Sequence, residues 1–120
     1  MDSQITWMPH AGHFICGERC QFRLNTHVNG FIISTVGEFV PVSKMDGAAF
    51  EEIGYKRLYE TMVFKAKKSK HGCCAYVQKN GNNIDFAGYN KPTDAYNGHM
   101  KFIRKYSKQQ PTPDARKERG

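Results

Sequence analysis

The sequence predicts an α+β fold, in which an antiparallel sheet of four to five strands is covered on one face by one C-terminal helix. Alternating apolar and polar residues flank an Asn-Gly dipeptide in the first half of the chain, further strand-like runs follow, and the last periodic segment is helical. A length of 120 residues suits one domain with one hydrophobic core. We therefore expect a single domain over residues 1–106.

The first predicted strand pair is the segment CQFRLNTHVNGFIISTVGEF. Its Asn29-Gly30 dipeptide accepts positive φ at both central positions of a type I′ turn, which predicts a β-hairpin with Val28 opposite Phe31. We expect the core face to carry Thr26, Leu24 and Phe22 opposite Ile33, Thr35 and Gly37. The reverse face is polar on the first strand but has Ile32 and Val36 on the second, so another segment should partly cover it.

The middle of the chain predicts one short irregular region and three more strands. SKMDGAAFEEIG, which ends at Gly54, allows about two turns of helix or an irregular connection. YKRLYETMVFKA has apolar side chains on both faces, which is typical of a central strand. CCAYVQ and IDFAGY are interpreted as the two strands of a second hairpin around the turn-rich KNGNN.

The segment KPTDAYNGHMKFIRKYSK predicts a helix from about Asp94 to Ser107, with Thr93 as its N-cap. The side that should pack on the sheet carries Ala95, His99, Phe102, Ile103 and Tyr106. Gly98 costs about 1 kcal/mol relative to alanine and reflects either a close approach to a strand or an imperfect helix. We expect His99 to be a core histidine that donates to a backbone carbonyl.

Charge and composition limit the partners and the compartment. The formal net charge of +7 favours association with polyanions or acidic protein surfaces. The chain shows neither a signal-like start nor a run of about 18 apolar residues, so we expect a cytoplasmic protein with no membrane partner. In that setting the four cysteines should be reduced thiols or metal ligands. The proline-containing end, residues 107–120, should be a flexible basic tail.

Zinc is the alternative to a protein without a cofactor, because zinc binds four sulfur or nitrogen ligands in a tetrahedron. The candidate ligands are Cys16, Cys20, His71, Cys73 and Cys74. Their spacing argues against a site, since three residues separate Cys16 from Cys20 where a zinc knuckle has two. Adjacent cysteines in a strand also point to opposite faces. We expect no cofactor.

No catalytic signature is present in the sequence. It contains no G-x-S-x-G, H-E-x-x-H, Walker loop or G-x-G-x-x-G motif. Groups that nucleophilic catalysis could use are present, but any globular chain of this composition offers as many. These groups are Cys16, Cys73, His13, His71, His99, Asp85 and Ser34. We therefore expect a protein that is not an enzyme.

Basic residues gather in two stretches of the chain, which are the candidate binding surfaces. The first comprises Lys56, Arg57, Lys65, Lys67, Lys68 and Lys70, and the second comprises Lys101, Arg104, Lys105 and Lys108. Such stretches could follow a phosphate backbone, although no recognition-helix pair, aromatic RNP motif or finger spacing supports base-specific recognition. The alternative is that they form solvated surfaces.

Three blocks, FIISTVGEF, YETMVF and IDFAGYNKPTDAYNGHMKF, together resemble a recurring pattern in small proteins encoded by bacteriophages and prophages. The resemblance spans roughly Phe14 to Tyr106, implies a viral origin and assigns no functional residue. Small phage proteins without an active site often bind and obstruct a host machine, including its defence systems.

This origin leads us to expect a phage accessory protein that binds and modulates or inhibits a host protein or nucleoprotein complex in the host cytoplasm. We expect a monomer or a small homo-oligomer. The alternative is a non-specific nucleic-acid-binding protein that uses the two basic stretches, with or without a structural zinc.

Overall fold

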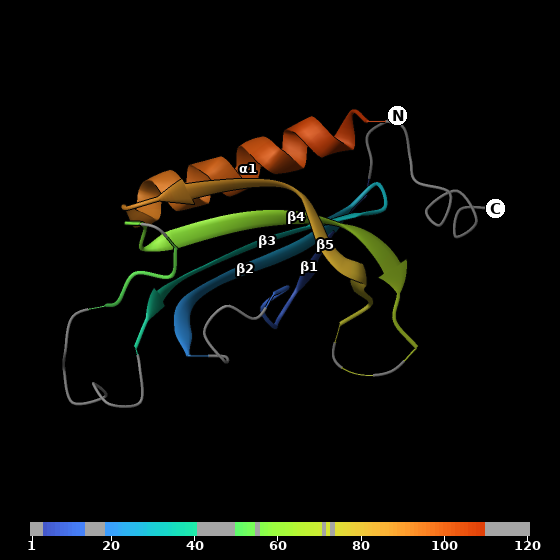
Figure 1. Ribbon diagram of the computed structural model, residues 1–120. Helices are drawn as coiled ribbons and strands as arrows, with labels where there is room; N and C mark the ends of the chain where they lie inside the picture. The colour runs from blue at the N-terminus through green and yellow to red at the C-terminus, as the bar shows by residue number, and fades with distance from the viewer. Residues whose placement is uncertain are drawn as a thin grey trace.

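In the computed structural model, five antiparallel strands form one sheet, and one helix lies lengthwise over a face of it (Figure 1). The structure describes residues 4–13, 19–40, 50–54, 56–70, 72 and 74–109. The elements are β1 (Ile5–Met8), β2 (Cys20–Val28), β3 (Phe31–Phe39), β4 (Tyr59–Lys68), β5 (Tyr76–Tyr89) and α1 (Pro92–Ser107). The predicted α+β class, with a C-terminal helix on an antiparallel sheet, is confirmed.

The strands lie in the sheet in the order in which they occur in the chain, β1-β2-β3-β4-β5. The predicted hairpin is β2–β3, and its register is confirmed, with Val28 opposite Phe31. Asn29 and Gly30 form the turn with φ values of 57° and 85°, as a type I′ turn requires. β4 pairs with both β3 and β5, which confirms that it is a central strand.

The helix α1 buries one side on the face of the sheet that the hairpin pattern predicted as the core. Ile103 and Tyr106 pack with Val28, Ile33 and Val63 in a cluster that also contains Phe31. Full burial of one such aliphatic side chain stabilises the fold by about 1.5 to 3 kcal/mol relative to exposure. This contact with the sheet, more than intrinsic propensity, stabilises a helix of 16 residues.

The start of α1 differs from the prediction. The helix begins at Pro92, two residues before Asp94, and its N-cap is Lys91, whose side chain makes no capping hydrogen bond. Proline is favoured in the first turn because its φ is already helical and its missing N–H needs no partner there. Thr93 therefore lies inside the helix, and the prediction that it caps the helix is wrong.

Gly98 is explained by a close approach to a strand, one of the two alternatives that the sequence left open. A Cβ atom at Gly98 would lie only 2.0 Å from the Tyr89 hydroxyl oxygen and 2.3 Å from Tyr89 Cζ. Tyr89 is the last residue of β5, so its ring occupies the space that a side chain at position 98 would need. The glycine lets α1 settle close to β5.

The reverse face of the sheet is covered by the segment that follows β1, as Ile32 and Val36 led us to expect. Met8, Ile32, Phe64 and Ala66 form a second buried apolar cluster there. Beside it, Gly12 N donates a hydrogen bond of 3.0 Å to Ser34 Oγ. β1, which pairs with β2 and precedes this segment, was not predicted because four residues carry too short an alternation.

The predicted second hairpin is wrong, because β5 is one strand that runs from Tyr76 to Tyr89. The turn-rich residues produce a bulge instead of a reversal. Phe64 pairs with Asn83 and Ala66 pairs with Gln78. A single residue of β4, Lys65, therefore lies opposite residues 79–82 of β5, and the extra residues of β5 form the bulge. Gly81, with φ of 78°, lies within this segment. Bulges of this kind bend a strand, and β5 curves strongly in Figure 1.

Two predicted features lie largely outside the described residues. They are the short helix or irregular connection over residues 43–54, of which 50–54 are described, and the flexible tail over residues 107–120, of which 107–109 are described. The described end of the connection is irregular, with isolated bridges from Glu51 to Phe39 and from Gly54 to Arg57. Ser107 is the last residue of α1 and not part of a tail. Over the described part of the chain, no helix has the length and apolar composition needed to cross a bilayer.

Candidate binding groove between α1 and β5

A groove of about 1050 Å³ runs along α1 where the helix passes over the C-terminal half of β5. Ala87, Gly88 and Tyr89 of β5 contribute to one wall, and α1 forms the other. Gly88 has a clear role here, since a Cβ atom at this position would lie 2.7 Å from Arg57 Cγ. The bare strand therefore lets the Arg57 side chain lie directly on β5 and reach the groove.

The lining of the groove is strongly basic. Its cations are Arg57, Lys91, Lys101, Arg104 and Lys105, and all of them are exposed. Asp94 is the carboxylate among the lining residues. Lys105 is paired with Asp85, but the other four cations make no ion pair within the part of the chain that the structure describes. The groove thus offers four positive charges that form no ion pair with a carboxylate of the described fold, and Asp94 offsets one of them at longer range.

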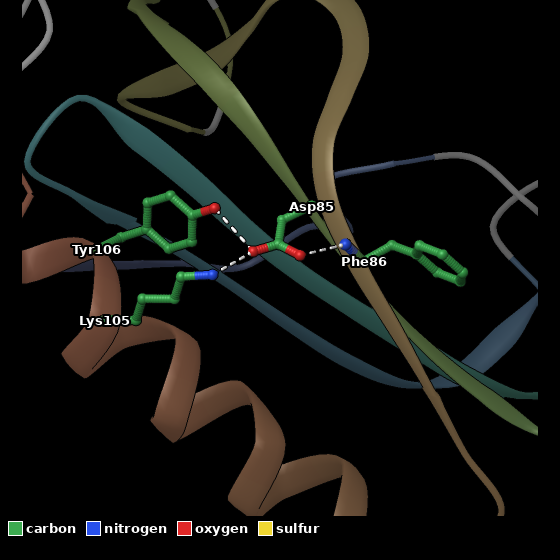
Figure 2. A network of polar contacts seen from close by, with 4 residues as sticks. All are labelled: Asp85, Phe86, Lys105 and Tyr106. Carbon is green, nitrogen blue, oxygen red and sulfur yellow. Dashed lines mark hydrogen bonds and ion pairs between the residues drawn. The ribbon is translucent and has the colours of Figure 1, made fainter.

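Asp85 ties the C-terminal end of α1 to β5 at one end of the groove (Figure 2). Its Oδ2 accepts hydrogen bonds from Lys105 Nζ at 2.7 Å and from the Tyr106 hydroxyl at 2.9 Å. Its Oδ1 accepts a bond of 3.0 Å from Phe86 N. Burial alone would raise the pKa of Asp85, but these hydrogen bonds and the charge of Lys105 lower it overall. The carboxylate is therefore ionised at neutral pH.

Exposed apolar side chains lie beside the groove. Phe86 is 62% exposed and Ile84 is 45% exposed, both on β5, while Tyr96 of α1 is 49% exposed. Figure 2 shows the Phe86 ring pointing away from the two helix side chains that hold Asp85. On that side of β5, a hollow of about 450 Å³ is bordered by Phe86, Glu60 and the Arg57 side chain. Basic and apolar surfaces thus meet along one strand.

The structure divides the first predicted basic stretch. Arg57 reaches the groove, whereas Lys56, which is exposed in the segment before β4, is not among the residues that line it. Lys65, Lys67 and Lys68 are exposed at the other end of β4, and Lys70 is exposed in the loop beyond. A strand of 10 residues spans roughly 33 Å, so these lysines lie far from Arg57.

The second predicted stretch stays together in the structure. Three of its residues line the groove, namely Lys101, Arg104 and Lys105. Lys108 is exposed just past the end of α1. Lys91 also lines the groove but was not predicted. The sequence signal for it is its place directly before the helix.

The histidine that the sequence placed in the core, His99, is fully buried. Its partners are hydroxyl groups, Thr26 Oγ1 at 3.1 Å from Nε2 and Thr35 Oγ1 at 2.7 Å from Nδ1, so the predicted backbone-carbonyl acceptor is wrong. Thr35 in turn bonds Thr61. Burial lowers the pKa of His99 to about 4, so the ring is neutral at pH 7. This network connects α1 to three strands and has no surface exposure.

Of the groups that catalysis could use, the structure brings His13 and Ser34 together. His13 Nδ1 and Ser34 Oγ are 2.6 Å apart, and both residues are buried. Burial lowers the pKa of His13 to about 4. Within the part of the chain that the structure describes, His13 Nε2 and Asn25 Oδ1 are buried and have no hydrogen-bond partner. Asp85 serves the tether described above, and Cys16, His71 and Cys73 lie outside the described residues.

The cysteines differ from the expectation in one respect. Cys20 forms a disulfide bond, so the prediction of a reduced thiol is wrong at this residue. A sulfur atom in a disulfide is not a thiolate and is not available as a zinc ligand. Cys74 is half-buried and lies outside any disulfide. Among the described residues, no group of three or more metal-ligating side chains occurs.

Comparisons with protein-family models, with curated proteins and with solved structures find no match to this chain. The resemblance to small phage proteins therefore stays a prediction, and the groove is the feature of the described fold that points to a binding function.

Proposed function

We propose that this protein is a non-enzymatic binding protein that docks an acidic segment of a host protein in the groove between α1 and β5. One observation carries the proposal. Arg57, Lys91, Lys101 and Arg104 line a single groove, are exposed and make no ion pair within the described fold. Cations arranged in this way attract an acidic chain and hold it along the helix.

The apolar residues beside the groove favour a protein partner. Interfaces between proteins combine a few large apolar or aromatic contacts with a polar rim. Phe86 and Ile84 supply such contacts on the same strand that forms a wall of the groove. The net charge of +7 adds a long-range field that speeds the encounter with an acidic surface.

The resemblance to small phage proteins supports a host target, with obstruction or modulation of a host complex as the result of binding. In this proposal the protein acts in the host cytoplasm by occupying its partner, as a monomer or small homo-oligomer, and needs no cofactor.

Non-specific binding of nucleic acid is the second candidate, and one feature of the structure favours it. Asn29 Nδ2 donates to Tyr106 O, and Ala66 N donates to Gly30 O, so the end of α1 and the end of β4 meet at the same turn. The exposed lysines of β4 and the loop after it therefore lie at the same end of the molecule as Arg104. A surface of this kind suits a phosphate backbone.

Charge reversal separates the two candidates. The groove variant is Arg57→Glu with Lys101→Glu and Arg104→Glu, and the matched control is Lys65→Glu with Lys67→Glu and Lys68→Glu, which changes the net charge equally. The probes are a labelled peptide rich in glutamate and a labelled oligothymidylate, measured by fluorescence anisotropy at about 50 and 200 mM salt.

We expect the groove variant to weaken peptide binding by tenfold or more, at about 1.4 kcal/mol per tenfold, and the control to change it much less. Equal weakening by both variants would show that only the total charge matters and would refute a defined groove. Oligothymidylate binding without peptide binding would establish the second candidate instead.

A further inference from the structure

The strand that borders the groove, β5, is the last strand of the sheet, so its outer side has no partner strand among the described residues. Such an edge presents backbone N–H and C=O groups that can pair with an extended segment of another chain. Many proteins protect long edges with bulges, and β5 has one at residues 79–82. The regular part of the edge runs from residue 85 to residue 89.

Two hydrogen bonds show which backbone groups face outward. Leu58 N donates to Tyr89 O, so the backbone of Tyr89 faces β4. Residues of a strand alternate between its two edges, so Gly88 and Phe86 face outward. The second hydrogen bond is consistent with this orientation, because Phe86 N donates to the Asp85 carboxylate and not to β4. The hydrogen bond to Asp85 uses only Phe86 N. The N–H and C=O groups of Gly88 and the C=O group of Phe86 therefore remain for pairing with an added strand.

The two faces of this edge differ in chemistry. On the α1 face, the groove supplies Lys101 and Arg104. On the opposite face, the exposed Phe86 ring is the large apolar side chain that borders the hollow of about 450 Å³, and Arg57 and Glu60 border it with opposite charges. A strand added beside β5 alternates its own side chains between the same two faces. Its residues on one side would therefore meet Lys101 and Arg104, and those on the other side would meet the Phe86 ring and the hollow beside it.

We propose that the partner adds a strand to the outer edge of β5, and that this strand alternates acidic and apolar residues. The acidic side chains lie toward the cations of the groove, and the apolar side chains lie on Phe86 and the hollow beside it. The inference rests on the proposed function and specifies its partner as an extended acidic–apolar segment. Main-chain pairing supplies affinity, and the alternation supplies specificity.

The test compares two peptides of the same composition, one with alternating glutamate and valine and one with glutamates and valines in separate blocks. We expect the alternating peptide to bind about tenfold tighter, because only it presents a charged and an apolar face at once. Two further versions carry N-methyl groups on every glutamate or on every valine. In the bound peptide, the N–H groups of alternate residues point toward β5 and those of the other residues point away from it. Methyl groups on the first set remove the hydrogen bonds to β5, so that version should lose binding, whereas the other version should keep it.

Variants of the protein add a control for the apolar face. Phe86→Ser should weaken the alternating peptide and leave the block peptide unchanged. Val77→Ser removes an exposed apolar side chain of β5 on the other side of the bulge, and we expect it to change neither affinity.

The outcomes separate the inference from the proposed function. Equal affinity of the alternating and block peptides, or equal effects of both N-methylated versions, would overturn strand addition and leave acidic docking in the groove intact. Failure of every acidic peptide to bind would overturn both. Sedimentation that shows a dimer of the protein alone, dissociated by Phe86→Ser, would assign the edge to a second copy and would also overturn the inference.

Discussion

Acid should destabilise this protein strongly between pH 6.5 and pH 4, because two histidines are buried in the neutral form. The pKa of His13 and that of His99 are each lowered from 6.5 to about 4 by burial. Above pH 6.5 both are neutral in the folded and the unfolded chain. As the pH falls toward 4, the unfolded chain binds two protons that the folded chain excludes, so the free energy of unfolding decreases.

The size of the effect follows from these values. One pKa unit corresponds to 1.36 kcal/mol, so a shift from 6.5 to about 4 is worth about 3 kcal/mol per histidine. Both together approach the whole stability of a typical domain, which is about 5 to 15 kcal/mol. The loss should level off below pH 4, where both states bind the protons.

Urea unfolding followed by circular dichroism from pH 7 to pH 4 measures this dependence. Carboxylates also titrate in acid, so the decisive comparison is His99→Gln, which keeps a polar side chain but cannot be protonated. It should lose about half of the histidine contribution, or about 3 kcal/mol, to the change between pH 6.5 and pH 4. His10→Gln, at an exposed position, is the matched control. A pH dependence identical in His99→Gln and the wild type would refute the reasoning.

Three further outcomes follow from the packing. Gly98→Ala should lower the free energy of unfolding by about 1 to 2 kcal/mol despite its better helix propensity, whereas the exposed Asn97→Ala should raise it slightly; a more stable Gly98→Ala would contradict the close packing on β5. Asp85→Asn should cost about 1 to 2 kcal/mol by loosening the end of α1, seen as faster amide exchange there. Alkylation of the denatured, unreduced chain should label Cys74 and spare Cys20; labelled Cys20 would exclude the disulfide.

The parts of the fold that sequence reasoning predicted correctly depend on local chemistry. The β2–β3 register followed from Asn29-Gly30, because a two-residue turn fixes every pair that comes after it. The covered side of α1 followed from the helical period. The error at KNGNN has a tertiary cause, since pairing with β4 holds Gln78 and Asn83 in one continuous strand despite the turn residues between them.

The candidate groove could be predicted only in part. Lys101 and Arg104 share a side of one helix, which spacing along the chain reveals. Arg57 lies near them because Tyr59 pairs with Tyr89, which places the segment before β4 beside the end of β5. No local sequence pattern predicts this register. The same extended geometry carries Lys65 to the opposite end of β4, so nearness in sequence was a poor guide to nearness in space.

The pairing of strands in chain order also has a consequence for synthesis on the ribosome. Each strand finds its neighbour as soon as the next one is made, but the apolar face that contains Ile33 and Val63 stays bare until α1 arrives. At about 5 to 20 residues per second, the 16 residues of α1 take roughly 1 to 3 s to make. We therefore expect the nascent chain to expose an uncovered apolar sheet face for that time, and a translational pause before Pro92 would prolong the exposure.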